Sequence, residues 1–386
     1  MIWFVLAFMT VYTGFHILFY RGVRAALPRG PWWRISLIAW MGLMQLTPLI
    51  YRFFEHQGLL SLASATALLG YFWMGLVILA LIVLGIIHLS SLALKLIRRK
   101  KRVAAPVNLA RRRAVATLVA APVLAGYGVW ESRQVQTRRL IIATPKLPPN
   151  LGLLKIALIS DLHLSVMTDI PWLDSVLGRI SKEAPDIVIS AGDFLDGRMP
   201  GMTALSARLN EIPAPLGKYA VIGNHEYYVG LDHALDCHQS AGFKLLRGEG
   251  LSVEGCVNLA GSDDARQPAG PAEAAMLSKL PQDLFTIFVR HRPLVPDETL
   301  GLFDLQLSGH THGGQITPFG MLVRLQFPYL AGGYQLEKGS RIYVNRGTGT
   351  WGPPMRVASP PEVTIIELVA EPVKGEASNS MTTFKT

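Results

Sequence analysis

Five apolar, β-branched runs of the sequence each end in residues that can bind a metal or move a proton. These residues are Asp161 and His163 after LKIALIS, Asp193 and Asp196 after DIVISAG, Asn224 and His225 after KYAVIG, His291 after FTIFVR, and His310 and His312 after FDLQLSG. Ligands of open α/β sheets bind at the carboxyl ends of the strands. If the runs share a sheet, their polar ends therefore converge on one rim. Gly192, Gly223 and Gly309 precede these ends and let the backbone turn sharply there.

The residue types predict the chemistry of this rim. Carboxylates, an amide and imidazoles suit Zn, Mn or Fe, with Mg a further option, whereas the histidines suit Ca poorly. Seven ligands are too many for one tetrahedral ion, but they fit two ions about 3.5–4 Å apart that share a carboxylate and a water. Each motif alone is also common in caps and turns. The five in order favour a dinuclear site, made by Asp161, His163, Asp193, Asn224, His291, His310 and His312.

Over about residues 154–370 the sequence resembles the calcineurin-like metallophosphoesterase superfamily. The matching pieces are DLH at 161–163, GDFLD at 192–196, GNHE at 223–226, His291 in VRHRP, and GHTHGG at 309–314. The segment NRGTGTWGPPMR at 345–356 is similar to the bacterial membrane-anchored branch. The resemblance implies an α/β fold in four layers, a β-sandwich of two mixed sheets flanked by helices. Arg290 departs from the family pattern of a small residue before the histidine, so it could narrow the pocket or contact a phosphate.

The resemblance also implies a role for each ligand. Asp161, His163 and His312 would bind one ion, Asn224, His291 and His310 would bind the other, and Asp193 would bridge them. Two such dications lower the pKa of a shared water toward ~7, so that hydroxide can attack a phosphoester at neutral pH.

Four other residues are candidates for work beside the metals. His225 is predicted to donate a proton to the leaving oxygen. The alternative for His225 is a hydrogen bond that only orients a ligand, which is also the role predicted for Asp196. Arg346 and Arg356 lie in a Gly/Pro-rich segment, where their guanidinium groups could either hold a phosphate or face water.

Charge and hydropathy divide the chain near residue 140. Residues 1–140 hold 17 Lys/Arg and two acids, and the rest holds 20 Lys/Arg and 25 acids, so the two parts carry +15 and −5 of the total +10. Apolar stretches at 2–20, 35–51, 68–90 and 114–130 lack a polar face, which predicts a transmembrane anchor of about four helices over 1–130. The basic residues lie in short runs between these stretches, so they indicate membrane topology and no nucleic-acid binding is expected.

The loops between the apolar stretches are rich, poor and rich in positive charge. The first and third loops carry the arginines and lysines, while the second holds Arg52 offset by Glu55. This pattern predicts a multi-pass protein of the cell inner (cytoplasmic) membrane, with the chain after 130 outside the cytoplasm. Arg133, Arg138 and Arg139 oppose this orientation mildly.

The rest of the chain is predicted to contain a linker, a catalytic domain and a tail. The proline-containing segment 131–153 is the predicted linker, 154–370 the metallophosphoesterase domain, and 371–386 a disordered tail. Residues 316–334 are unusually apolar for a segment that follows metal ligands. They could pack beneath a hairpin, or form a wall that receives a lipid chain or meets the bilayer surface. Cys237 and Cys256 could be two buried thiols or a disulfide.

These observations favour a metal-dependent phosphoesterase that hydrolyses phosphate mono-, di- or pyrophosphoesters at the membrane surface. Its partners would be the membrane and a phosphoester substrate, including a lipid-linked one, and no obligate protein partner is inferred. One alternative is a cytoplasm-facing pyrophosphatase of the UDP-diacylglucosamine type. A second alternative is a catalytically inactive membrane receptor or scaffold, which the complete ligand set disfavours. A transporter is also disfavoured, because Glu55 is the one acid among the apolar stretches.

Overall fold

The computed structural model describes residues 2–97, 108–198, 202–264 and 269–371. The chain divides into two compact units. The first comprises residues 1–130 with 352–355, and the second comprises residues 131–351 together with the chain from 356 onward.

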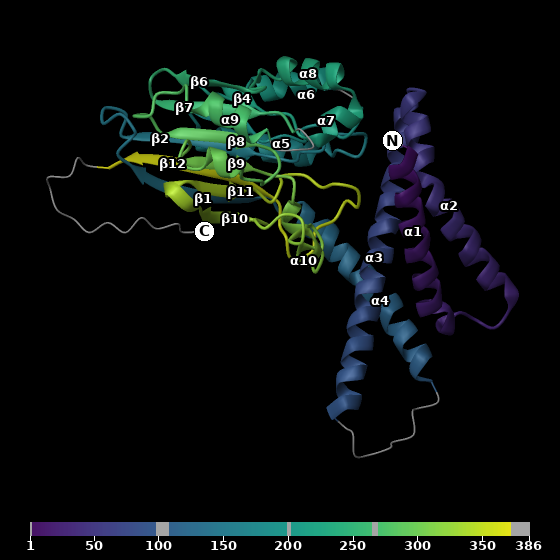
Figure 1. Ribbon diagram of the computed structural model, residues 1–386. Coiled ribbons are helices and arrows are strands. Elements are labelled where there is room, and N and C mark those ends of the chain that lie inside the picture. The colour runs from purple at the N-terminus through teal and green to yellow at the C-terminus, as the bar shows by residue number, and fades with distance from the viewer. Residues whose placement is uncertain (1, 98–107, 199–201, 265–268, 372–386) are drawn as a thin grey trace. The chain divides into compact units, whose positions relative to one another are not determined.

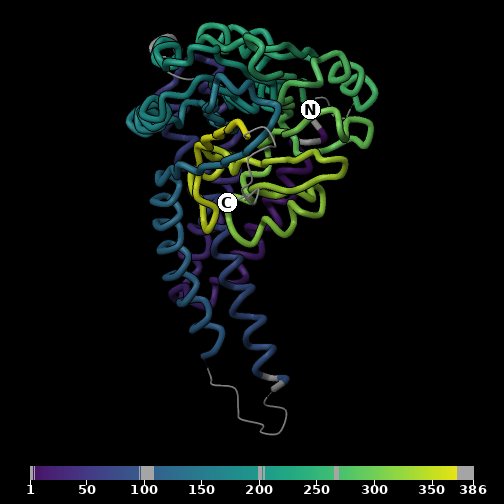
Figure 2. Tube along the Cα trace, turned by 90° about the vertical axis from the view of Figure 1, so that its left-hand side faces the viewer, coloured from purple at the N-terminus to yellow at the C-terminus, as the bar shows by residue number. Residues whose placement is uncertain are grey.

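The N-terminal unit is helical. It consists of α1 (Ile2–Val23), the turn η1 (Arg24–Ala26), α2 (Pro31–His56), α3 (Leu60–Ile97) and α4 (Leu109–Ser132), and each predicted apolar stretch lies in one of the four α-helices. Within the described part of the chain, three helical segments are long and apolar enough to cross a membrane: Pro31–His56, Leu60–Leu94 and Leu109–Ser132. Helices α1, α2 and α3 pack together (Figures 1 and 2). Their outward-facing apolar side chains, such as Trp32 and Leu89, are exposed, as expected of helices that face lipid.

The second unit is a sandwich of two six-stranded sheets. Its first sheet has the order β1 (Gln136–Thr144), β12 (Glu362–Ala370), β2 (Leu153–Ile159), β3 (Ile187–Ser190), β4 (Lys218–Ala220) and β5 (Lys244–Leu245). Its second sheet has the order β10 (Gly332–Gln335), β11 (Arg341–Val344), β9 (Leu305–Ser308), β8 (Thr286–Arg290), β7 (Val257–Ser262) and β6 (Glu249–Val253). Both sheets mix parallel and antiparallel pairs, as predicted.

Helices cover both outer faces of the sandwich (Figure 1). The first sheet packs against α5 (Ile170–Glu183), α6 (Met202–Asn210) and α8 (Leu231–Ser240), with the short α7 (Asn224–Val229) beside them. The second sheet packs against α9 (Gly270–Leu277). The remaining short elements are η2 (Asp297–Thr299), η3 (His312–Gly314), α10 (Gly320–Val323) and η4 (Glu337–Gly339). The result is the predicted four-layer arrangement of helix, sheet, sheet and helix.

The core explains why the strands read as continuous apolar runs. Between the sheets, side chains such as Ile156 and Ile189 pack against Ile287 and Leu305. The alternate residues of β2 and β3, such as Ala157 and Val188, face the helices instead. Strands buried on both faces lose the apolar–polar alternation of a surface strand.

The linker predicted over 131–153 differs from the structure. Residues 136–144 form β1, which pairs in parallel with β12 along its whole length. This segment forms a strand because buried and exposed side chains alternate along it: Leu140 and Ile142 are buried, whereas Arg139 and Ile141 are exposed. The sandwich therefore begins earlier than predicted, with three residues between the end of α4 and the start of β1. Of the predicted tail, residues 372–386 lie outside the described residues.

Candidate metal centre

Five strands deliver the predicted ligands to one end of the sandwich. Strands β2, β3 and β4 of the first sheet end just before Asp161, Asp193 and Asn224, and strands β8 and β9 of the second sheet end just before His291 and His310. Backbone hydrogen bonds tie the strand ends together. The Asp161 N–H donates to Gly192 O (3.0 Å), the His163 N–H donates to Asp193 O (3.1 Å), and the Gly309 N–H donates to His291 O (2.9 Å). The rim predicted for one sheet is therefore shared by two.

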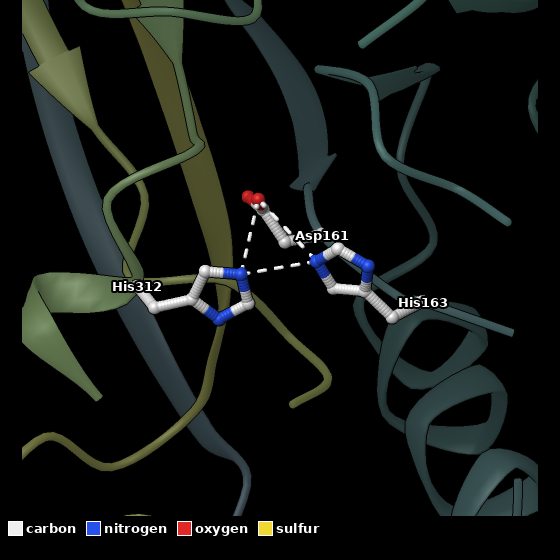
Figure 3. Close-up of side chains that lie close together, drawn as sticks. All are labelled: Asp161, His163 and His312. Carbon is white, nitrogen blue, oxygen red and sulfur yellow. Dashed lines mark hydrogen bonds and ion pairs between the residues drawn. The ribbon is translucent and has the colours of Figure 1, made fainter. Parts of the chain in front are cut away.

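The first group of side chains consists of Asp161, His163 and His312 (Figure 3). The two imidazoles face each other, with His163 Nε2 3.0 Å from His312 Nε2. Asp161 Oδ1 lies 3.4 Å from His312 Nε2 and 3.9 Å from His163 Nε2. All three side chains are buried, so the structure brings three potential ligand atoms together in a space shielded from water.

The second group consists of Asp193, His291 and His310. His291 Nε2 lies 3.0 Å from Asp193 Oδ2 and 3.2 Å from His310 Nδ1. The same carboxylate oxygen of Asp193 lies 3.9 Å from His163 Nε2 in the first group. Asp193 is therefore placed between the two groups.

Asn224 lies at the start of α7, beside Asp193. The next residue, His225, donates its backbone N–H to Asp193 Oδ1 (2.8 Å). The preceding residue, Gly223, could not carry a side chain, because a Cβ there would collide with the Asp193 carboxylate. Within the described part of the chain, the buried Oδ1 of Asn224 accepts no hydrogen bond. A buried acceptor of this kind is rare unless it serves a ligand or an ion.

Backbone strain concentrates at these residues. Five of the seven predicted ligands have a positive φ: Asp161 (53°), His163 (50°), Asp193 (50°), His310 (71°) and His312 (50°). This left-handed region is unfavourable for residues with a Cβ and persists where the surroundings enforce it, most often at functional sites. The strain therefore marks the same residues that the sequence pattern indicated.

The electrostatic environment keeps three of the imidazoles neutral. Burial, together with nearby histidines, lowers the pKa of His163 to about 4 and that of His310 to about 3. Burial also holds the pKa of His312 well below its usual value. A neutral imidazole is the form that binds a metal ion.

The buried carboxylates and His291 shift one another's pKa values. Burial would raise the pKa of Asp193, but His291 and His225 hold it well below its ordinary value. Burial would also lower the pKa of His291, but Asp193 raises it to about 10. Burial raises the pKa of Asp161 to about 6. The centre of the cluster is thus a carboxylate that stays ionised at neutral pH.

His225 and Asp196 form a pair at the edge of the cluster. His225 Nδ1 lies 2.7 Å from Asp196 Oδ1, and its other ring nitrogen, Nε2, lies 4.0 Å from Asp193 Oδ2. Burial would lower the pKa of His225, but Asp193 and Asp196 raise it to about 9. The ring of His225 also contacts the exposed side chains of Tyr228 and Trp351, so it lies between the cluster and the surface.

The three arginines singled out by the sequence take different positions. Arg356 is fully buried and donates to the backbone oxygens of Gly349 and Ser359, with Nη2 3.2 Å from His312 Nδ1, so it supports His312 and does not reach out to a phosphate. Arg290 is buried, with Nη1 3.5 Å from Glu273 Oε2, so its guanidinium group faces a carboxylate of the protein. Arg346 is partly exposed beside Gly313 and donates to Glu362 Oε2 (2.9 Å). A phosphate contact by Arg346 stays a prediction.

Glu226 is a site residue whose role the sequence did not reveal. Its buried carboxylate accepts backbone N–H groups from Asp193 (3.2 Å), Phe194 (2.6 Å), Leu195 (3.2 Å) and Gly223 (2.8 Å). It therefore joins the loop after β3 to the loop after β4. The motif GNHE contains this residue and one of its partners, Gly223, but the other three partners are more than 30 residues away and depend on the tertiary fold.

Asp264 and Arg292 form a second unrecognised pair. Arg292 Nη2 lies 3.1 Å from Asp264 Oδ2, and Asp264 is attached to the end of β4 through a backbone hydrogen bond to Ile222 O (3.1 Å). In the sequence, the one indication that Arg292 lies near the site is its position next to His291 in VRHRP.

Comparisons with known proteins give the family of this chain. A family model described as calcineurin-like phosphoesterase matches residues 154–314. A metallophosphoesterase of Aquifex aeolicus is 37% identical over 254 residues, which are 64% of this chain and 97% of that protein. A metallophosphoesterase of Campylobacter jejuni is 36% identical over 56% of this chain and 59% of its own length. A zebrafish transmembrane protein with a metallophosphoesterase domain is 31% identical over 67% of this chain and 63% of its own length.

Solved structures give more distant matches. The NAD nucleotidase of Haemophilus influenzae is 16% identical with a TM-score of 0.36, covering 50% of each chain. A dimetal phosphatase from zebrafish is 12% identical with a TM-score of 0.31, covering 50% of this chain and 87% of its own. The near-complete match to the Aquifex relative, together with the motifs, shows the family. The chain belongs to the calcineurin-like metallophosphoesterases, a family of metal-dependent phosphoester hydrolases, and includes apolar helices of membrane-spanning length.

Proposed function

We propose that this protein hydrolyses phosphate mono-, di- or pyrophosphoesters at a membrane surface with two divalent cations, Mn, Zn or Fe in preference to Mg. One cation would be held by Asp161, His163 and His312, the other by Asn224, His291 and His310, and Asp193 would bridge them. The observation that carries the proposal is the position of Asp193, whose Oδ2 lies within 4 Å of histidines from both groups. One shared carboxylate is how dinuclear hydrolases hold two ions close together.

The residues of the cluster fit such cations. His163 Nε2 and His312 Nε2 lie 3.0 Å apart, and both rings are neutral at pH 7, which is the form in which an imidazole nitrogen can bind a cation. The orphaned Oδ1 of Asn224 supplies a further neutral oxygen. Neutral nitrogens combined with carboxylate oxygens suit transition metals better than Ca.

When bound, the two cations would activate a water and neutralise charge on the phosphoryl oxygens. The protein's own residues hold this chemistry in position. His291 is oriented by the hydrogen bond from Nδ1 to Ala191 O (2.8 Å), which directs Nε2 toward Asp193. The Arg356 guanidinium fixes the loop of His312 through His312 O (3.3 Å). Such contacts preserve ring orientation and ligand strength.

His225 is the proposed proton donor. Asp196 holds its Nδ1, so that Nε2 faces the cluster and can deliver a proton to the leaving oxygen. A histidine placed within reach of the leaving group is suited to this role. Asp196 acts through His225.

The proposed location is the extracytoplasmic face of the inner membrane. The support is the alternation of positive charge between the apolar stretches, which favours the sandwich outside the cytoplasm. An inactive scaffold is disfavoured because six of the seven proposed ligands lie in groups of side chains that could hold a metal ion.

The direct test uses purified full-length protein in detergent, loaded in turn with Mn, Zn, Fe or Mg. Each preparation is assayed with matched phosphate monoesters, diesters and pyrophosphates. The proposal predicts turnover that requires a cation and is lost on chelation. Undiminished turnover after exhaustive chelation, or none with any cation and ester, would contradict it.

A further inference from the structure

A turn rich in exposed apolar side chains follows the metal-ligand loop of His310 and His312. Met321 is 73% exposed, Leu322 is 60% exposed and Leu325 is 83% exposed. Isolated exposed apolar residues are ordinary, but three within five residues, in α10 and the turn that follows it, form a patch that favours contact with an apolar partner. Packing beneath a hairpin, one explanation of the apolar segment 316–334, accounts for the buried Ile316 and Phe327 but not for these three. We call Met321, Leu322 and Leu325 the apolar turn.

The apolar turn is fixed to the metal-ligand loop. The Phe327 ring packs edge-on against His310, with ring centroids 4.9 Å apart. The Thr311 hydroxyl donates to Leu330 O (2.6 Å). On the other side of the loop, Gln315 exchanges two hydrogen bonds with the backbone of Trp351, whose exposed ring contacts His225. An apolar surface thus borders the candidate active site.

Within the second unit, backbone pairing connects the apolar turn to Glu131, the penultimate residue of a helix with the length of a membrane span. The segment Leu109–Ser132 has the length and hydropathy of a span. Within the second unit, its penultimate residue Glu131 is buried and accepts the backbone N–H of Ala358 (2.8 Å). The neighbouring Val357 pairs with Gln315 and Thr317, which lead into α10. Two backbone contacts and a few residues of chain thus connect the apolar turn to Glu131. If α4 spans the membrane, Glu131 lies at the membrane interface.

The register of the strands shows independently at which end of the sandwich the chain enters it. The Gln136 N–H at the start of β1 donates to Pro361 O (2.8 Å), and Thr348 joins Glu362 O to Ser160 O through two hydrogen bonds of 2.8 Å each. The start of β1 is therefore level with Ser160, which immediately precedes the proposed ligand Asp161. Three residues separate α4 from β1. The chain thus enters the sandwich at the end that carries the metal centre.

We propose that the apolar turn, with Trp351, enters the lipid bilayer beside the metal centre, and that the site acts on a phosphoester-bearing lipid taken from that bilayer. The substrate class rests on the proposed function, whereas the bilayer contact does not. Apolar side chains with an intervening basic residue, here Arg324, are typical of segments at the membrane interface, where the charged group reaches the headgroups. A lipid whose chains stay in the bilayer would present its headgroup directly to the cluster.

The bilayer contact is tested with spin labels on full-length protein in nanodiscs of phosphatidylcholine and phosphatidylglycerol. Labels are attached at Leu325→Cys, or at Leu153→Cys as a control, in a background with Cys237→Ala and Cys256→Ala. Leu153 is also exposed, but it pairs with Val369 at the opposite end of the first sheet. We expect the label at 325 to be relaxed by oxygen and shielded from an aqueous nickel chelate, and the label at 153 to show the reverse. Equal access of the chelate to both labels would overturn the proposal.

The substrate class is tested with two diesters that share one scissile bond, hexadecyl and ethyl 4-nitrophenyl phosphate. The variant M321S/L322S/L325S should lower kcat/KM for the hexadecyl ester by about tenfold or more and change the ethyl ester by less than about twofold. The matched variant M321L/L322M/L325M should change neither. An equal fall for both esters, or no fall for either, would overturn the lipid assignment. Failure of the wild type on both diesters and on every phosphate monoester and pyrophosphate would defeat the proposed function, while the spin labels would still decide bilayer contact.

Discussion

At the scale of single residues, two histidines of the cluster each have one ring nitrogen held by a hydrogen bond and the other ring nitrogen directed toward the site. His225 is held by Asp196 through Nδ1 and presents Nε2 to the site. His291 is held by Ala191 O through Nδ1 and presents Nε2 to Asp193. Such fixed orientation lets a reaction proceed without first ordering its catalytic groups.

Replacing His225 should show whether it donates a proton. For His225→Ala we expect hydrolysis of alkyl phosphates, whose leaving groups need a proton, to slow by about 10²–10³-fold. Hydrolysis of 4-nitrophenyl esters should slow much less, because nitrophenolate leaves without protonation. The measurement is kcat across a series of leaving groups, with the exposed His233→Ala as the matched control. Equal slowing across the series would assign His225 to ligand orientation only.

The burial of His238 should make the stability of the fold depend on pH. Burial between Phe194 and Phe243 lowers its pKa to about 4, from 6.5. Because the folded-state pKa is depressed, the neutral ring's contribution to stability is complete above pH 6.5 and is lost as the pH falls toward 4. His238→Leu should therefore lose roughly 2 kcal/mol less stability than the wild type between pH 7 and pH 4.5. Urea unfolding in detergent at both pH values measures this, and parallel losses in the two proteins would refute it.

At the scale of elements, the turns after the strands determine the geometry. Residue types at strand ends are local features, so the sequence was sufficient to predict the positions of Asp161, Asp193 and His310. Three other features depend on segments that are distant in sequence: the left-handed backbone of these residues, the burial of Arg356, and the bonds of Glu226 to the loop after β3. Strand β1 was missed for the same reason, because its partner β12 lies more than 200 residues away along the chain. The ligand roles themselves stay predictions.

Glu226 should be essential to the turns after β3 and β4. In Glu226→Gln, one of the two acceptor oxygens becomes an NH₂ group that faces backbone donors, which should cost about 2 kcal/mol of stability or more. We also expect weaker metal retention, because the loop that carries Asp193 loosens. Thermal unfolding in detergent and metal content after dialysis test this against the exposed Glu211→Gln. A variant as stable and metal-retentive as this control would show that the carboxylate is dispensable.

At the scale of the whole molecule, charge and hydropathy separate an apolar, basic N-terminal part from an acidic catalytic part. Composition alone was sufficient to predict this division. The boundary was misplaced because β1 contains two adjacent arginines, Arg138 and Arg139, which are more typical of a connecting segment than of a strand. The order of basic and neutral loops predicts the side of the membrane on which hydrolysis occurs.

Reporter fusions at the C-terminus test that orientation. We expect a fused periplasmic phosphatase to be active and a fused green fluorescent protein to be dark, since each folds on one side of the membrane only. The reverse pair of results would place the sandwich in the cytoplasm and favour a substrate of that compartment. A fusion to the loop near Arg111 should give the opposite readout and controls for expression.

The central claim is that one carboxylate joins two cations in a single site, and metal content measured on active protein tests it most directly. Elemental analysis of wild-type protein and of the exposed-residue control Asp232→Asn should give about two cations per chain, with full turnover. Asp193→Asn should retain fewer than about one and lose turnover, while its circular dichroism stays unchanged. Active wild-type protein without cations, or an Asp193→Asn variant that keeps both its cations and its turnover, would contradict the account.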